Sequence, residues 1–176
     1  MLEGNSKVPP RTSSVPGSDE AFQALLLRIA AKANDRSDAA SLIHLFCHAT
    51  REFFQVSGVY FWRRESEDQL VGEQADGKMA ERFQGLRLKQ HESAVTMEAV
   101  RRRRALFVNQ LDAANYTAAS EFGARSLMAV PLVVFNEVIG ATTFLHDSDE
   151  EFYRDLLDAK LKFIQTRRFW DAAARN

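Results

Sequence analysis

The sequence has a single cysteine, few prolines, almost no net charge and no long apolar run. Cys47 alone excludes an intramolecular disulfide and a metal site built from several thiolates. The 23 basic and 24 acidic residues leave a formal net charge of −1, which disfavours a nucleic-acid-binding protein because that class usually carries a basic excess. No stretch approaches the roughly 18 apolar residues of a membrane span, and the N-terminus lacks the residue order of a signal peptide. These absences leave a cytoplasmic protein as the expectation.

The composition fits one globular domain preceded by a tail. The chain has 176 residues, of which 45% are apolar and 27% charged, enough for a proper hydrophobic core. Residues 1–18 hold three of the four prolines and few apolar side chains, so we expect a disordered tail there. Residues 19–176 are the expected domain.

Periodicity places helices at both ends of that domain and strands between them. Apolar residues recur at helical spacing from Asp19, and again in a second helix that ends near Gln55. The expected strands are 56–64, 69–74, 105–109, 126–134 and 138–146. A central helix is expected at 92–104, between the second and third strands, and a last helix begins at Asp149.

The segment 126–140 is apolar enough for a buried strand, yet it contains Pro131. The strand expected at 105–109 is much shorter, so a longer neighbour would outrun it and be an edge over part of its length, where proline is tolerated. Asn136 suits the positive φ of a tight hairpin. Gly140 would let a helix or a ligand approach the sheet closely.

The order of these elements resembles that of the GAF domain family. The resemblance is carried by four stretches: "SLIHLFCHATREFFQVSGVYFW", "SAVTMEAVRRRRALFVNQLDAANY", "GARSLMAVPLVVFNEVIGATTFLHD" and "DEEFYRDLLDAKLKFI". They cover most of residues 39–164, and the run Arg125-Ser126, Val130-Pro131-Leu132, Val138-Ile139-Gly140 is their most specific part. Asn136 departs from the glycine that is common in the family.

The resemblance implies an α+β, profilin-like fold around a central antiparallel sheet. With the five expected strands numbered along the chain, the implied order is 2-1-5-4-3. The terminal helices would cover one face of the sheet. The other face, closed by the central helix and the loop 111–124, would hold a small-molecule pocket.

Several chemistries known in this family lack the residues they need here. Covalent bilin attachment requires a thiol near the pocket loop, but Cys47 falls on the helix expected behind the sheet. The free methionine sulfoxide reductases of this fold work through several cysteines, and one cysteine cannot complete that exchange. The Asn-Lys…Phe…Asp-Glu pattern of the cyclic-nucleotide binders is not found, which disfavours that class without excluding it.

The histidines and the arginine run favour ordinary surface roles. His44 and His48 have the spacing of two ligands on one helix face, but a closed zinc site needs four ligands and this face is polar, so we interpret both as solvated. His91 is interpreted as a capping or surface residue, with haem ligation as the alternative. The arginines 101–104 fan around the last turn of a helix, where the helix dipole favours cations, rather than forming one phosphate-binding patch.

The residues left to line a pocket are mainly aromatic and polar. Tyr and Trp combine apolar area with one polar atom, as small-molecule sites often do, although ordinary core packing is the alternative for each aromatic. The candidate ligand-binding residues are Tyr60, Trp62, Phe107, Asn115, Tyr116, Arg125, Met128 and Thr142. Strand alternation places Tyr60 and Trp62 on the same face. No cofactor or metal is identified by these residues, and none forms a recognisable catalytic group.

The last helix carries more apolar surface than one sheet can cover. Its heptad-like spacing suggests a parallel homodimer in which the first and last helices form a bundle, with pairing inside one monomer as the alternative. We therefore expect a GAF-type sensory module that binds a small molecule and relays its state through the terminal helices to an output domain or partner protein. The alternatives are a dimerisation scaffold with an empty or self-filled pocket, and a haem-binding or enzymatic protein of the same fold.

Overall fold

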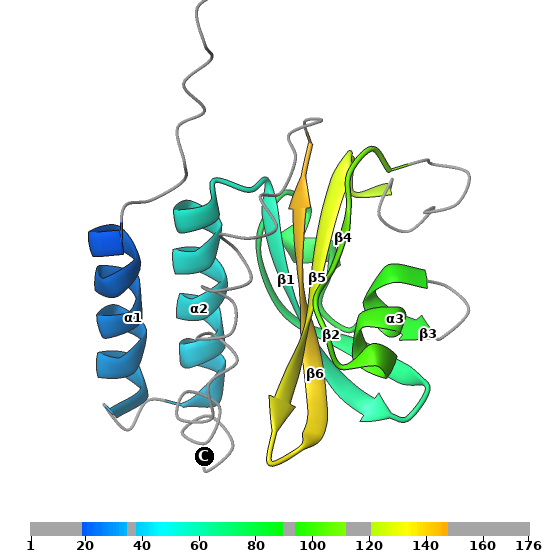
Figure 1. Ribbon diagram of the computed structural model, residues 1–176, viewed down its shortest axis with the longest axis horizontal. Coiled ribbons are helices and arrows are strands. Elements are labelled where there is room, and N and C mark those ends of the chain that lie inside the picture. The colour runs from blue at the N-terminus through cyan, green and yellow to red at the C-terminus, as the bar shows by residue number, and fades with distance from the viewer. Residues whose placement is uncertain (1–18, 35–37, 90–93, 112–120, 148–176) are drawn as a thin grey trace, which may run out of the picture.

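The computed structural model describes residues 19–34, 38–89, 94–111 and 121–147 (Figure 1). The predicted tail 1–18 and the predicted final helix from Asp149 lie outside the described residues. Among the described helices, none is long and apolar enough to cross a bilayer.

The helices begin and end close to the predicted boundaries. They are α1 (Asp19–Asn34), α2 (Ala39–Phe54) and α3 (Ala94–Arg102), with a short 3-10 turn η1 (Ala80–Arg82). Asp38 caps α2, because its carboxylate accepts hydrogen bonds from the Ser41 backbone N–H at 2.7 Å and from the Ser41 hydroxyl at 2.9 Å. These bonds hold the pKa of Asp38 below its ordinary value. Gln55 ends the helix in the left-handed conformation, with φ 53°.

The described strands form one antiparallel sheet in the order β3-β2-β1-β6-β5-β4. Their bounds are β1 (Gly58–Ser66), β2 (Gln69–Gly77), β3 (Arg87–Lys89), β4 (Leu106–Val108), β5 (Ser126–Val134) and β6 (Glu137–His146). The five predicted strands have the predicted order, but the prediction missed β3, which extends the sheet beyond β2. Only three residues long and carrying an apolar side chain only at Leu88, β3 gives too short an alternation to be recognised in the sequence.

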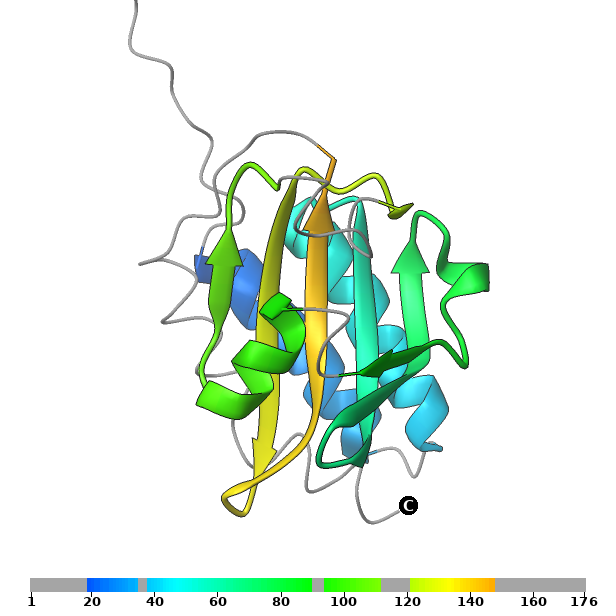
Figure 2. The ribbon, with the colours of Figure 1, turned by 90° about the vertical axis from the view of Figure 1, so that its right-hand side faces the viewer.

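Two hydrophobic cores lie on opposite faces of this sheet. Helices α1 and α2 cover one face, and α3 lies on the other, as Figures 1 and 2 show from two sides. Phe46, Phe61 and Phe144 belong to the core on the face covered by α1 and α2. Tyr60 and Trp62 belong to the core beneath α3. Alternation along β1 therefore divides neighbouring aromatics between the two cores, as the sequence predicts for Tyr60 and Trp62.

The oddities of the closing hairpin have definite structural reasons. β4 pairs with β5 only as far as Ala129, so Pro131 lies beyond the shorter strand as predicted. Asn136 has φ 67° in the turn to β6, again as predicted. The explanation offered for Gly140 is wrong: a Cβ there would lie 2.1 Å from the carbonyl oxygen of Trp62, so the neighbouring strand, rather than a helix or a ligand, requires glycine.

Candidate functional site

The predicted pocket residues are divided between the two faces of the sheet. Tyr60 and Trp62 are buried under α3. Met128 belongs to the opposite core and Phe107 packs against it. Thr142 pairs with Phe61 and therefore also lies on the face covered by α1 and α2.

The prediction that these five residues line one chamber is therefore wrong. The error arises because side chains alternate between the two faces along a strand, so a shift of one position moves a side chain to the other face. On β6 it is Thr143 that points beneath α3, because it pairs with Tyr60. The side chain that could serve a site there is thus one residue beyond the predicted one.

Of the remaining predicted residues, only Arg125 belongs to the described part of the chain, where it directly precedes β5. Asn115 and Tyr116 are outside the described residues. The side chain of Arg125 is exposed, and its backbone N–H donates to the His146 carbonyl at 2.7 Å. Its carbonyl accepts from the Leu111 N–H at 2.6 Å, so the two chain segments that flank residues 112–120 are held side by side.

Aromatic rings pack against one another beneath α3. The Tyr60 ring centroid lies 5.2 Å from that of Phe83 and 5.1 Å from that of Phe122, and the Trp62 and Phe83 centroids are 4.5 Å apart. Phe83 is fully buried although it follows the short turn η1. Neither phenylalanine can be assigned to a face from the sequence, because each lies in an irregular segment without periodicity.

A short polar chain crosses the same apolar core. The Trp62 indole N–H donates to the Thr143 hydroxyl at 3.0 Å, and the hydroxyls of Thr143 and Thr96 are 3.3 Å apart. These contacts satisfy buried polar atoms that would otherwise cost about 1–3 kcal/mol each. The Thr142 hydroxyl on the other face is buried without a hydrogen-bond partner among the described residues.

Tyr60 connects the core beneath α3 to the end of β2. Its hydroxyl donates to the carbonyl of Lys78, the residue that follows β2. Burial raises the pKa of Tyr60 to about 12, so the phenol stays protonated and keeps this donor at neutral pH. Gly77 precedes Lys78 with φ 112°, and a Cβ there would lie 2.3 Å from the Ser57 carbonyl oxygen. The chain can turn here only because residue 77 is glycine.

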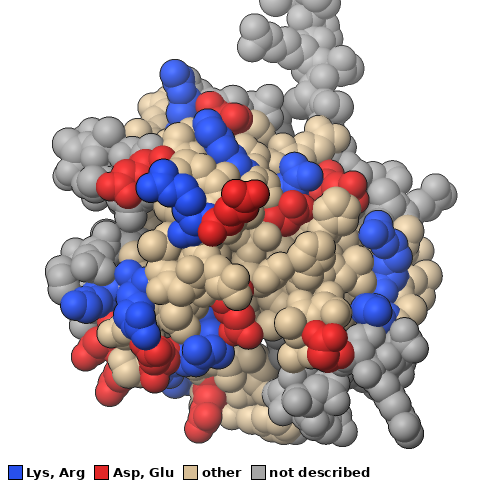
Figure 3. Space-filling model, turned by 180° about the vertical axis from the view of Figure 1, so that it is seen from behind, with Lys and Arg blue, Asp and Glu red and all other residues tan. Residues whose placement is uncertain are grey.

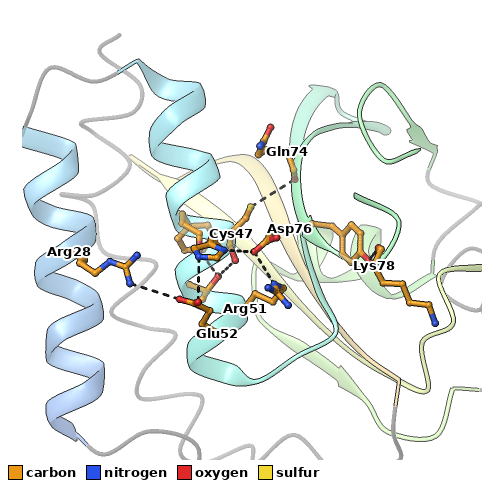
Figure 4. A network of polar contacts seen from close by, with 11 residues as sticks. Arg28, Cys47, Arg51, Glu52, Gln74, Asp76 and Lys78 are labelled. Carbon is orange, nitrogen blue, oxygen red and sulfur yellow. Dashed lines mark hydrogen bonds and ion pairs between the residues drawn. The ribbon is translucent and has the colours of Figure 1, made fainter. Parts of the chain in front are cut away.

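Asp76, one residue earlier, attaches the same end of β2 to α2. Its Oδ2 accepts from the Arg51 Nε at 2.9 Å and lies 2.8 Å from the His48 Nδ1 (Figure 4). Partial burial acts to raise the pKa of Asp76, but the hydrogen bonds from Arg51 and His48 outweigh it and hold that pKa below the ordinary value. The prediction of a solvated residue is confirmed for the exposed His44. The His48 side chain is 39% exposed, and its contact with this carboxylate was not predicted.

The contacts continue from α2 to α1. The His48 Nε2 is 3.4 Å from the Glu52 Oε1, and the Arg28 Nη1 of α1 is 4.0 Å from the Glu52 Oε2 (Figure 4). Arg28 and Glu52 are each more than half exposed, so this outer link contributes little stability. We name the group Tyr60, Lys78, Asp76, Arg51, His48, Glu52 and Arg28 the polar junction. Side-chain contacts run from Asp76 through α2 to Arg28 of α1. The backbone of Gly77 joins Asp76 to Lys78, whose carbonyl accepts the hydrogen bond from Tyr60 in the core beneath α3.

Cys47 lies on α2 behind the sheet, as predicted. Its side chain is buried, its Sγ is 3.9 Å from the Gln74 carbonyl oxygen, and burial raises the pKa of the thiol well above its ordinary value. A neutral thiol enclosed in this way is a poor nucleophile and a poor metal ligand.

The other polar residues singled out in the sequence form no metal site among the described residues. No group of three or more His, Cys, Asp or Glu side chains there could hold a metal ion, and His91 lies outside that part of the chain. The arginines 101–104 are exposed at the end of α3, where Arg101 and Arg102 pair with Glu98. Lys, Arg, Asp and Glu are interspersed over the surface in Figure 3, in keeping with the near-zero net charge.

Comparisons with known proteins agree with this architecture. A family model described as GAF domain matches residues 37–159. A search of curated proteins gives no match.

Among solved structures, the GAF domain from a phosphoenolpyruvate-protein phosphotransferase of Coxiella burnetii has a TM-score of 0.73 at 15% identity, covering 90% of this chain and 96% of that chain. The phycoerythrobilin-bound GAF domain from a cyanobacterial phytochrome has a TM-score of 0.74 at 12% identity, covering 89% and 97%. The free methionine-R-sulfoxide reductase of Neisseria meningitidis has a TM-score of 0.70 at 22% identity, covering 90% and 95%. At these identities the likeness concerns the fold.

Proposed function

Because the chain belongs to the GAF domain family, we propose that it is a sensory and regulatory module that binds a small molecule beneath α3 and relays its state through the helices on the other face. The observation that carries this proposal is the polar junction. A single side chain of the α3 core, Tyr60, bonds to the backbone two residues after Asp76, which in turn holds α2 through Arg51 and His48.

The ligand that we propose is neutral or mildly anionic and contacts Tyr60. Phe122 is only partly buried and packs on Tyr60, so it is the ring that a ligand would displace or reorient. Trp62, Asn115, Tyr116 and Arg125 remain the other proposed ligand-binding residues. A change in the position of Tyr60 alters its bond to the Lys78 carbonyl, and Asp76 transmits that change to α2. The extent of the shift is limited by the ligand's preference for one of the two states.

Relay of a signal through the helices requires another protein surface that binds them. We propose a parallel homodimer formed by α1 and the predicted final helix, whose signal reaches an output domain or a signalling protein in the cytoplasm. The exposed Leu27 of α1, at 71% of its full accessible surface, supports this use of the outer helix. Light scattering that shows a monomer at high micromolar concentration would remove the dimer from the proposal and leave ligand binding untouched.

A dimerisation scaffold without a ligand is the second candidate. It is favoured by the mutual packing of Tyr60, Trp62, Phe83 and Phe122, which fills much of the space beneath α3 with the protein's own rings. Enzymatic activity is not proposed. The fold is shared with a free methionine-R-sulfoxide reductase, but this chain has one cysteine, and that cysteine is buried on the other face.

Native mass spectrometry of the freshly purified full chain separates these candidates. The sensory proposal predicts a bound mass of small-molecule size that is lost on Tyr60→Ala, while a control variant on the opposite face, Thr142→Val, retains it. Protein that carries no added mass after purification and gains none from a metabolite extract would favour the scaffold. An absorption spectrum of the same sample tests the haem alternative, which requires a strong visible band.

A further inference from the structure

The turn between β5 and β6 carries an exposed aromatic residue in the left-handed backbone conformation. Phe135 is 65% exposed and has φ 48°, directly before Asn136 with φ 67°. The left-handed conformation is disfavoured for a bulky side chain and suits glycine or asparagine, which are the usual residues of such two-residue turns. Backbone preference therefore disfavours phenylalanine at this position.

Arginines hold this turn from both sides. At the end of α3, the Arg103 Nη1 donates to the Asn136 Oδ1 at 3.2 Å. On the other side, the Arg64 Nη1 donates to the carbonyl of Val138 at 3.2 Å. The end of α3 is itself fixed, because the Arg104 N–H donates to the Ala99 carbonyl at 3.3 Å. An exposed ring on a braced turn loses little conformational entropy when it binds a partner.

The charge beside the turn is positive, because Arg103 contacts Asn136 and the exposed Arg104 follows Arg103 in the chain. Glu98 pairs with Arg101 and Arg102, whereas no carboxylate of the described residues lies within ion-pair distance of Arg103 or Arg104. Glu137, exposed next to Asn136, is the one acidic residue of the turn. Aromatic residues and arginine are the types enriched at the centres of protein interfaces.

We propose that Phe135, Asn136, Arg103 and Arg104 form a docking surface for an acidic segment of a partner protein that also carries an apolar side chain. The guanidinium groups would bind its carboxylates, and the Phe135 ring would bury against its apolar group. A second copy of this chain does not fit, because two identical positive surfaces repel each other. A membrane or a nucleic acid would need a larger cluster of cations than this surface provides.

The test is a titration of the isotopically labelled full chain, followed by NMR, with a synthetic peptide in which glutamates flank a Leu-Leu pair. The expected amide shifts are confined to residues 103–105 and 134–138, and the affinity falls as salt is added. The same peptide with glutamine in place of every glutamate should bind at least about tenfold more weakly. Vesicles of phosphatidylserine and phosphatidylcholine are the comparison probe.

Two variants keep the result interpretable. Phe135→Asn suits the positive φ, so it should raise the urea midpoint of unfolding while weakening peptide binding about tenfold. Glu137→Gln removes the one opposing charge and should tighten binding. The proposal is overturned by equal binding of the glutamate and glutamine peptides, by unchanged affinity in Phe135→Asn, or by shifts of these amides with the vesicles and not with the peptide.

Discussion

Replacing Asp76 by asparagine removes the charge at the centre of the polar junction and preserves its shape. The carboxylate receives Arg51 at 2.9 Å and His48 at 2.8 Å, and its side chain is 22% exposed. Hydrogen bonds to charged groups contribute about 1.5–3 kcal/mol. An amide retains one acceptor for Arg51, so we expect Asp76→Asn to lower the free energy of unfolding by about 1–2 kcal/mol.

The effect has a definite pH dependence. The folded-state pKa of Asp76 lies below its ordinary value of 3.8, so its contribution is fully present above that value and is lost as the pH falls through the folded-state pKa. At pH 7 the difference between wild type and Asp76→Asn should therefore be complete. It should shrink as the pH falls from the ordinary value through the folded-state pKa, below which both proteins carry a neutral group at this position.

Urea unfolding followed by circular dichroism measures this difference, with Glu73→Gln as the matched control. Glu73 lies on the same strand as Asp76 and pairs with Arg63 of β1 at 3.3 Å. The Glu73 and Arg63 side chains are 36% and 52% exposed, so the control should lose less than about 1 kcal/mol. If the two variants are equally stable at pH 7, the junction is an ordinary surface ion pair and the reasoning fails.

Three further predictions concern side chains on either face of the sheet. Gly140→Ala should lower the free energy of unfolding by about 1–3 kcal/mol or prevent folding, because the added Cβ would meet the Trp62 carbonyl at 2.1 Å, and a normal urea midpoint would contradict this. Thr142→Val should be neutral or stabilising in thermal unfolding, since it removes an unpaired buried hydroxyl. Thr143→Val should lower the free energy of unfolding by about 1–2 kcal/mol, because it leaves the Trp62 indole unpaired. The opposite ranking would refute the assignment of faces. Cys47 should react with a disulfide reagent only as fast as the protein unfolds, because its thiol is enclosed and its pKa is raised, and rapid reaction of folded protein would show that α2 opens readily.

Alternation and turn chemistry predict much of this fold from the sequence. The shared face of Tyr60 and Trp62, the positive φ of Asn136 and the position of Pro131 beyond β4 follow from local rules. The strand order does not; it is what the resemblance to the GAF family implies. Each rule acts over a few residues, which is why it works without a structure.

The candidate site is harder to predict from the sequence than the fold, because its residues depend on strand register and on irregular segments. The sequence predicts Thr142 as a site residue, whereas Thr143 faces the core beneath α3, and only the pairing of β6 with β1 distinguishes their faces. The contact of His48 with Asp76 joins residues 28 positions apart, and a helical wheel cannot show that a polar face meets the end of a strand. Phe83 is buried from a loop, where periodicity gives no information.

The account depends on physical coupling between Tyr60 and α2. Amide hydrogen exchange of Tyr60→Phe, which removes the bond to the Lys78 carbonyl and keeps the ring, tests that coupling directly. The account predicts faster exchange in the half of α2 that contains His48 and Arg51, with no such change in Thr143→Val, whose hydroxyl serves the same core but not β2. Faster exchange limited to the surroundings of residue 60, with α2 as protected as in the wild type, would contradict it.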